Sequence, residues 1–196
     1  MDDLEKRILE LSFKHELSHI GSCLTSVGIL DGIYSLKEDD EKCVLSCGHA
    51  GLALYVVLEK YFGIDAEMLL KKHGVHPNRD LEYKIDCSTG SLGQGLPIAL
   101  GMAIADRSKN VYCLISDGEA AEGSIYEALN TRSKYEIDNL IIYCNVNDYS
   151  AYDETTYLSI PDVNMEYTGD HWFMKKYGQE AHYKILNEVE YKRLIF

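Results

Sequence analysis

Two apolar runs separated by a helical stretch constrain the fold of this chain more than any other feature of its sequence. The first run is Val111–Ile115, and the second is Leu140–Cys144. Between them, residues 120–134 form a predicted helix. Strands that are apolar on both faces are typical of a parallel sheet covered on both sides. The pattern therefore predicts a βαβ unit within a three-layer α/β fold, with a mainly parallel sheet and helices on both faces.

The rest of the chain supplies further elements of the same kind. Residues 4–17 carry apolar side chains at helical spacing, and a glycine break at Gly21 precedes the next predicted helix. The chain has 196 residues without a repeat or a linker, which predicts a single domain over residues 1–196. The remaining predicted elements are helices at Thr25–Leu36, Leu52–Phe62, Asp65–Lys72 and Leu96–Asp106, a short strand at Cys43–Ser46, and an irregular stretch at Gly74–Ser91.

Charge and composition exclude several classes of partner. A formal net charge of −13 argues against a nucleic-acid surface, and no apolar stretch is long enough to span a membrane. The acidic N-terminus is unlike a secretory signal, so we expect a cytoplasmic protein. The six cysteines include no C-x-x-C pair, which disfavours a structural zinc site. Because an acidic chain repels phosphates, a phosphate-bearing ligand would need a divalent cation to mediate its contact.

Polar residues follow both apolar runs at the point where each strand ends. Asp117-Gly118 follows the first run, and Asn147 follows the second, 147 − 117 = 30 residues later. In open parallel sheets, ligands bind outside the carboxyl ends of the strands. A carboxylate, an amide oxygen and a nearby backbone carbonyl are oxygen ligands that suit Mg²⁺ shared with a diphosphate. Asp-Gly alone is a common turn dipeptide, as at Asp31-Gly32, so the position after a buried strand carries the prediction.

Five ordered blocks between Ser18 and Asn147 resemble motifs of the transketolase family. The block at 117–123 is similar to the family pattern Asp-Gly-x-x-x-Glu-Gly, followed by the asparagine thirty residues on. The resemblance covers most of the chain and fades after about residue 178. The other blocks are Ser18-His19-Ile20-Gly21, Leu45-Ser46-Cys47-Gly48-His49-Ala50, His76-Pro77-Asn78 and Thr89-Gly90-Ser91-Leu92-Gly93-Gln94-Gly95.

The resemblance implies a thiamine-diphosphate-binding fold and a set of site residues. Its cofactors would be thiamine diphosphate and Mg²⁺ or Ca²⁺, with the metal held by Asp117, Asn147 and the carbonyl of Tyr149. We expect the remaining histidines, at positions 15, 73, 171 and 182, to be structural or surface residues. The implied cofactor-binding residues are His49, Gly90, Leu92, Ser116, Asp117, Gly118, Glu119 and Asn147, and the implied catalytic residues are His19, His76, Glu122 and Glu127.

These catalytic residues divide into two groups. The resemblance implies that His19 and His76 face the reacting carbon and the donor's hydroxyl groups. It implies that Glu122 and Glu127 join a carboxylate network near a subunit interface.

The sequence departs from the family pattern at five positions. The first glycine of Gly-Asp-Gly is Ser116, and the proline of the upstream loop is Ser91. Ile20 replaces a proline, and Asn145-Val146 replaces the usual acidic pair. A small residue at position 116 still permits backbone contact with a phosphate, so we expect cofactor binding to survive.

A larger departure concerns the second family domain, which supplies the glutamate that activates the cofactor ring. We expect this chain not to supply it, because the sequence ends at Phe196, and we expect the cofactor domain to be shortened at its C-terminal end. The chain thus resembles the N-terminal subunit of a split transketolase. The resemblance implies transfer of a two-carbon ketol unit from a ketose, or its phosphate, to an aldose acceptor. It also implies that a C-terminal subunit supplies the glutamate and the basic residues, in a hetero-oligomer with two copies of each subunit.

Three other functions compete with this prediction. His15-Glu16-Leu17-Ser18-His19 matches the H-E-x-x-H signature of zinc peptidases, which requires both histidines on one helix. A subunit of a related decarboxylating synthase is the nearest alternative, although Glu122-Gly123 favours the transketolase branch. A non-catalytic partner subunit that keeps only the fold is the third.

Overall fold

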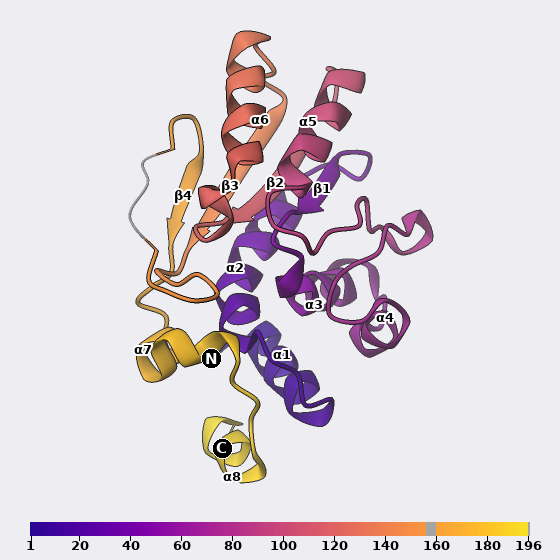
Figure 1. Ribbon diagram of the computed structural model, residues 1–196. Helices are drawn as coiled ribbons and strands as arrows, with labels where there is room; N and C mark the ends of the chain where they lie inside the picture. The colour runs from indigo at the N-terminus through magenta and orange to yellow at the C-terminus, as the bar shows by residue number, and fades with distance from the viewer. Residues whose placement is uncertain (156–159, 196) are drawn as a thin grey trace.

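The core of the molecule is a parallel sheet whose strands follow one another in chain order. The computed structural model describes residues 1–155 and 160–195. Within these residues the sheet has the order β1-β2-β3-β4, and all its pairings are parallel (Figure 1). The predicted mainly parallel sheet is thus confirmed. The strands are β1 (Lys42–Leu45), β2 (Val111–Ser116), β3 (Leu140–Val146) and β4 (Asn164–Tyr167).

Helices cover both faces of this sheet and form two separate hydrophobic clusters. On one face α2 (Ile20–Leu36) contacts the sheet, and four further helices join it in one hydrophobic cluster: α1 (Asp3–Lys14), α3 (Gly51–Phe62), α4 (Ala66–His73) and α7 (Trp172–Tyr177). The other packs against α5 (Gly95–Ala105) and α6 (Gly123–Lys134), which lie side by side in Figure 1. A last helix, α8 (Glu188–Ile195), packs against α1. The three-layer α/β prediction is confirmed.

The side chains of β2 show why this sheet needs cover on both sides. Tyr112 and Leu114 belong to the cluster with α1–α4, whereas Val111, Cys113 and Ile115 belong to the cluster with α5 and α6. All five are buried. Each fully buried aliphatic side chain contributes about 2 kcal/mol of hydrophobic free energy. A strand with apolar residues at every position is therefore stable only in the middle layer.

Helix α1 ends between the two histidines of the H-E-x-x-H pattern. Glu16 has a φ of 52°, and the amide of Leu17 donates to the carbonyl of Ser12 at 2.9 Å. This is the Schellman arrangement, in which a left-handed residue ends a helix. His15 therefore caps α1, whereas His19 precedes α2. The peptidase hypothesis is wrong, because the two histidines do not share a helix.

Helix α2 begins earlier than the sequence predicts. We expected a break at Gly21 and a helix from Thr25, but α2 starts at Ile20 and includes both residues. A Cβ atom at Gly21 would lie 2.8 Å from Ala181 Cβ and 2.8 Å from Met174 Sδ. Glycine at this position therefore permits close packing rather than a helix break.

The described helices include none that is long and apolar enough to cross a membrane.

Short 3₁₀ turns connect the main elements. The 3₁₀ turns are η1 (Gly48–Ala50), η2 (Leu81–Tyr83), η3 (Glu119–Ala121) and η4 (Gly178–His182).

Candidate cofactor site

A cavity of about 210 Å³ lies at the carboxyl edge of the sheet. Ser116 ends β2, Asn147 follows β3, and His49 follows β1, so the parallel strands deliver all three to one place. Most of its wall consists of residues that the sequence had singled out. The lining residues are His19, His49, His76, Gly90, Leu92, Ser116, Gly118, Asn147, Tyr149, Ser150, Ala151, His182 and Tyr183.

Asp117 lies directly behind this wall and is held by the loop that follows β3. One carboxylate oxygen accepts the amide of Gly118 at 2.9 Å. The other accepts the amide of Asp148 at 2.8 Å and the hydroxyl of Thr155 at 2.8 Å. Burial raises the pKa of this carboxyl above its usual value, despite these three donors. Among the described residues it pairs with no Lys, Arg or His, so a nearby cation would stabilise its ionised form.

Asn147 and Tyr149 present further oxygen atoms to the same cavity. Asn147 is buried, and its side-chain oxygen accepts the amide of Tyr149 at 3.2 Å while its nitrogen faces the hydroxyl of Thr25 at 3.4 Å. The carbonyl of Tyr149 accepts a hydrogen bond from His182 at 3.1 Å. A carbonyl oxygen has two lone pairs, so one remains available.

These donors fit a metal shared with a diphosphate better than a metal held by protein alone. Within the described parts of the chain, no group of three or more His, Cys, Asp or Glu could hold an ion. A carboxylate, an amide oxygen and a carbonyl are hard ligands that leave room for phosphate oxygens. The Nδ1 atom of His19 is buried and has no partner among the described residues, as expected for a cavity that receives a ligand. The residues present therefore fit a metal ion that is shared with a diphosphate.

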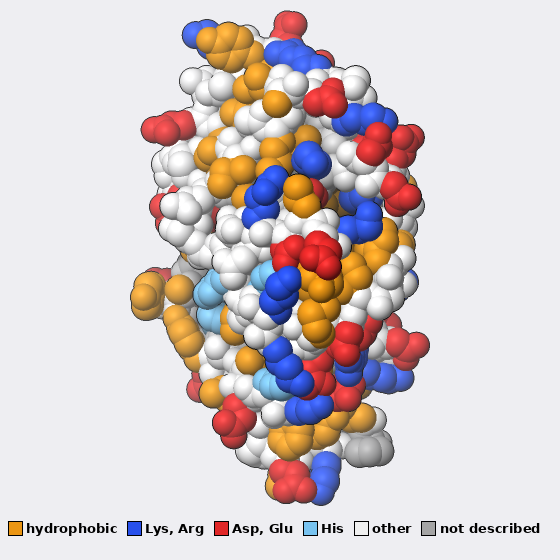
Figure 2. Space-filling model, turned by 90° about the vertical axis from the view of Figure 1, so that its right-hand side faces the viewer, with side chains coloured by type: hydrophobic (Ala, Val, Ile, Leu, Met, Phe, Trp, Pro, Cys, Tyr) orange, Lys and Arg blue, Asp and Glu red, His pale blue; other side chains and the backbone are white. Residues whose placement is uncertain are grey.

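Several histidines line the cavity and lie close to one another. The ring centroids of His19 and His49 are 5.4 Å apart, and those of His49 and His182 are 6.4 Å apart. Burial, followed by the neighbouring histidines, lowers the pKa of His49 to about 3. Burial also lowers the pKa of His19. Figure 2 shows histidine side chains gathered midway along one face of the molecule. Neutral rings of this kind can accept a proton or a hydrogen bond from a substrate hydroxyl.

Two glycines allow the loops around the cavity to approach each other. A Cβ atom at Gly90 would lie 3.0 Å from the ring of His76. A Cβ atom at Gly48 would lie 2.6 Å from the amide nitrogen of Gly90. Glycines at both positions therefore bring the histidine blocks and the 89–95 loop together.

Glu119 does not line the cavity, although we expected it to bind the cofactor. Its side chain is fully buried and accepts the hydroxyl of Ser46 at 2.6 Å and the amide of Gly93 at 2.6 Å. Its other oxygen has no partner within the described chain, and burial raises the pKa of the carboxyl. This carboxyl thus joins the ends of β1 and β2 to the loop before α5.

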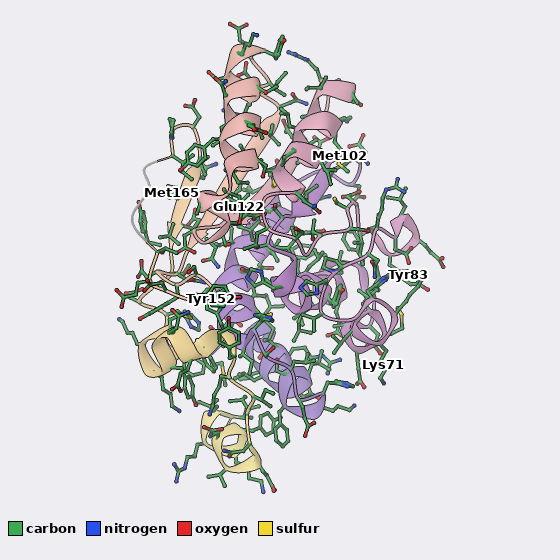
Figure 3. All side chains as sticks on the ribbon, in the orientation of Figure 1. Lys71, Tyr83, Met102, Glu122, Tyr152 and Met165 are labelled. Atoms are coloured by element: carbon green, nitrogen blue, oxygen red, sulfur yellow. The ribbon has the colours of Figure 1, made fainter. Side chains whose placement is uncertain are left out.

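Glu122 and Glu127 also lie outside the cavity. Glu122 precedes α6, at the lower end of that helix in Figure 3, and Glu127 lies within it. Both are exposed, so the predicted carboxylate network at a subunit interface stays a prediction.

The cavity wall also contains residues that the sequence did not indicate. His182 was expected to be structural or surface, yet its ring lines the cavity beside Tyr183. Ser150 and Ala151 complete the same side. None of these four residues belongs to a motif. His182 and Tyr183 also lie beyond the point where the family resemblance fades, so no local signal could have identified them.

An open parallel sheet with a histidine-lined cavity at its carboxyl edge is typical of α/β proteins that bind a phosphate-bearing cofactor. A family model described as the transketolase thiamine diphosphate binding domain matches residues 36–194. The chain therefore belongs to the transketolase family and contains its thiamine-diphosphate-binding domain.

Similar proteins include both split and full-length transketolases. One of the subunits of apulose-4-phosphate transketolase from Phocaeicola vulgatus is 35% identical over 162 residues, which cover 72% of this chain and 57% of that protein. Human transketolase is 42% identical over 119 residues, which cover 55% of this chain and 19% of that protein. The chain thus spans little more than half the length of the split relative.

The solved structure of transketolase from Leishmania mexicana has the same fold. It superposes with a TM-score of 0.63 at 22% identity, and the match covers 81% of this chain and 30% of that one.

Proposed function

We propose that this chain is the N-terminal, cofactor-binding subunit of a two-component transketolase-like enzyme. One observation carries the proposal: residues from all five sequence blocks line, or lie directly behind, a single cavity at the carboxyl edge of the sheet. The enzyme would transfer a two-carbon ketol unit from a ketose, or its phosphate, to an aldose acceptor. Its cytoplasmic location stays a prediction.

The protein's residues would hold the cofactor through its diphosphate. Asp117, Asn147 and the Tyr149 carbonyl would bind Mg²⁺ or Ca²⁺, and this cation would offset the negative field of an acidic chain. Ser116, Gly118 and His49 would contact the diphosphate from the cavity wall.

The remaining residues would orient the reacting groups. The backbones of Gly90 and Leu92 would contact the cofactor's ring. His19 and His76 would accept hydrogen bonds from the sugar hydroxyls and hold protons near the cleaved bond. Bound thiamine diphosphate would supply the carbon nucleophile, so the protein's own part is positioning and exclusion of water.

A second subunit is needed in this proposal to complete the site. The cavity contains no carboxylate that could activate the cofactor ring, among the lining residues of the described chain. Apolar side chains on α5 and α6 offer a surface for that subunit, because Ile98, Ile104 and Tyr126 are more than two-fifths exposed. We propose a hetero-oligomer with two copies of each subunit, in which Glu122 and Glu127 lie near the interface.

Calorimetric titration with thiamine diphosphate and Mg²⁺ tests the cofactor assignment directly. The wild-type chain, alone or together with its C-terminal subunit, should show saturable binding that depends on Mg²⁺. Asp117→Asn should weaken this binding by about 10- to 100-fold, because it removes a charged metal ligand. Asp31→Asn is the matched control, since Asp31-Gly32 is the same dipeptide but Asp31 pairs with Lys60 at 2.6 Å, away from the cavity. Equal binding by both variants would refute the assignment.

Reconstitution tests the dependence on a partner. The chain alone should not transfer ketol groups, and activity should appear when the copurifying C-terminal subunit is added. Transfer at a normal rate by the chain alone would contradict the two-component proposal. Cofactor binding without transfer in the complex would favour a non-catalytic subunit, and release of CO₂ from a keto acid would favour a decarboxylating synthase.

A further inference from the structure

A short segment near the C-terminus holds the loop that carries the proposed metal-binding carbonyl. The carbonyl oxygens of residues 149–151 each accept a hydrogen bond from a side chain of residues 179–183. Nε2 of His182 lies 3.1 Å from the first oxygen, Nε2 of Gln179 2.7 Å from the second, and Oη of Tyr183 2.6 Å from the third. We call Gln179, His182 and Tyr183 the carbonyl clasp.

His182 occupies the central position of this clasp. A carbonyl can only accept, so Nε2 of the ring donates to Tyr149. In the neutral ring, Nδ1 then accepts from the hydroxyl of Ser22, 3.0 Å away. The backbone carbonyl of His182 accepts the amide of His19 at 2.7 Å. This residue thus joins both the metal-binding loop and the start of α2, and it is buried.

The clasp is anchored to the hydrophobic core. Ala181, between Gln179 and His182, packs against Gly21, where a Cβ atom would lie 2.8 Å away. Phe173 and Met174, just before the clasp, are buried in the cluster that covers the sheet. The hydrogen-bond donors of the clasp are therefore held in place by a backbone that packs against the core.

We propose that the carbonyl clasp positions the Tyr149 carbonyl for the metal–diphosphate group, and that His182 is its principal positioning residue. This inference rests on the proposed function. The hydrogen bond to His182 occupies one lone pair of the carbonyl and leaves the other for the cation. Pinning the next two carbonyls as well, at Ser150 and Ala151, fixes the orientation of this peptide before the cofactor arrives.

The experiment measures the Mg²⁺ concentration that gives half-maximal binding of thiamine diphosphate by the chain together with its copurifying C-terminal subunit. His182→Leu removes the donor and should raise this concentration about 10-fold, the equivalent of one hydrogen bond. His182→Gln keeps an N–H donor and should rescue most of the loss. An unchanged half-saturation in His182→Leu would overturn the proposal.

A matched control separates positioning from general stability. His171 precedes α7, shortly before the clasp, and bonds Glu5 at 2.8 Å, away from the cavity. His171→Leu should lower the midpoint of thermal unfolding and leave the Mg²⁺ half-saturation unchanged. Equal shifts in His171→Leu and His182→Leu would overturn the positioning role.

A milder variant covers the case in which His182→Leu does not fold. Tyr183 is 54% exposed, so Tyr183→Phe removes one hydroxyl donor and little packing. It should raise the Mg²⁺ half-saturation about threefold, and no shift would again overturn the proposal. Absence of cofactor binding by the wild-type chain, both alone and with its C-terminal subunit, would refute the proposed function instead, so the two failures are distinguishable.

Discussion

Lowering the pH from about 7 to about 5 should destabilise the folded chain through His49. Burial and the nearby rings of His19, His182 and His76 lower the pKa of His49 from 6.5 to about 3. Between these two values the unfolded chain binds a proton at His49, whereas the folded chain does not. The contribution of this ring to stability is therefore complete above about pH 6.5 and is lost progressively as the pH falls.

The expected size of the loss follows from the same two pKa values. Each pH unit below the unfolded pKa costs about 1.4 kcal/mol, so a fall from about pH 7 to about pH 5 costs about 2 kcal/mol of unfolding free energy. Asp117 and Glu119 act in the opposite direction, because burial raises their pKa and the folded chain binds their protons first. A His49→Gln variant removes the contribution of His49 to the pH dependence of stability and keeps the contributions of Asp117 and Glu119.

Urea unfolding followed by far-ultraviolet circular dichroism provides the assay. The free energy of unfolding is measured for the wild-type chain and for His49→Gln at several values between about pH 7 and about pH 5. The wild-type chain should lose about 2 kcal/mol more than the variant over this range. Parallel pH curves for the two proteins would refute the reasoning, because the His49 ring would then titrate alike in the folded and unfolded chains.

Three further predictions concern the surroundings of the site. Gly93→Ala should lower the unfolding free energy by at least about 2 kcal/mol in urea, because φ is +80° and the new Cβ would lie 2.8 Å from Glu122 Cβ. Asn145→Leu should cost about 2–4 kcal/mol in the same assay, since buried Asn145 bonds three hydroxyls, including that of Thr168 at 2.5 Å. After incubation with zinc and desalting, metal analysis should find far less than one zinc per chain, and His15→Ala should not change that result; stoichiometric zinc lost in the variant would revive the peptidase hypothesis.

The strands and their common edge were predictable because the physical signal is local. Apolar runs such as Val111–Ile115 leave few alternatives to a buried parallel strand, and a βαβ unit brings successive strand ends to one edge. Ser116 pairs with Asn145 in the observed register, so Asp117 and Asn147 lie at the same edge, where Asp117 accepts the amide of Asp148. His49, which follows β1, reaches this edge for the same reason, whereas His19, His76 and Gly90 reach it from loops.

The errors arose where tertiary packing decides local structure. The sequence around His15 continues a helical pattern, but Glu16 adopts a left-handed conformation and ends α1 there. Gly21 resembles a helix break, yet it lies inside α2 because the chain near Ala181 packs against it. β4, α7 and α8 follow the last recognised motif and were not predicted.

His182 shows the limit of motif-based prediction most clearly. Its hydrogen bond to Ser22 joins residues 160 positions apart. No spacing rule in the sequence connects two such positions. Only the folded chain shows that this histidine lines the same cavity as His19 and His49.

The position of the carbonyl clasp also has a consequence for the order of events during synthesis. All five sequence blocks leave the ribosome before residues 179–183 do. Contacts between the clasp and the start of α2 form late, because they close a long loop. The nascent chain can therefore fold its sheet early but cannot finish the cavity until the clasp emerges. Capture of the cofactor would then mark the end of folding rather than its beginning.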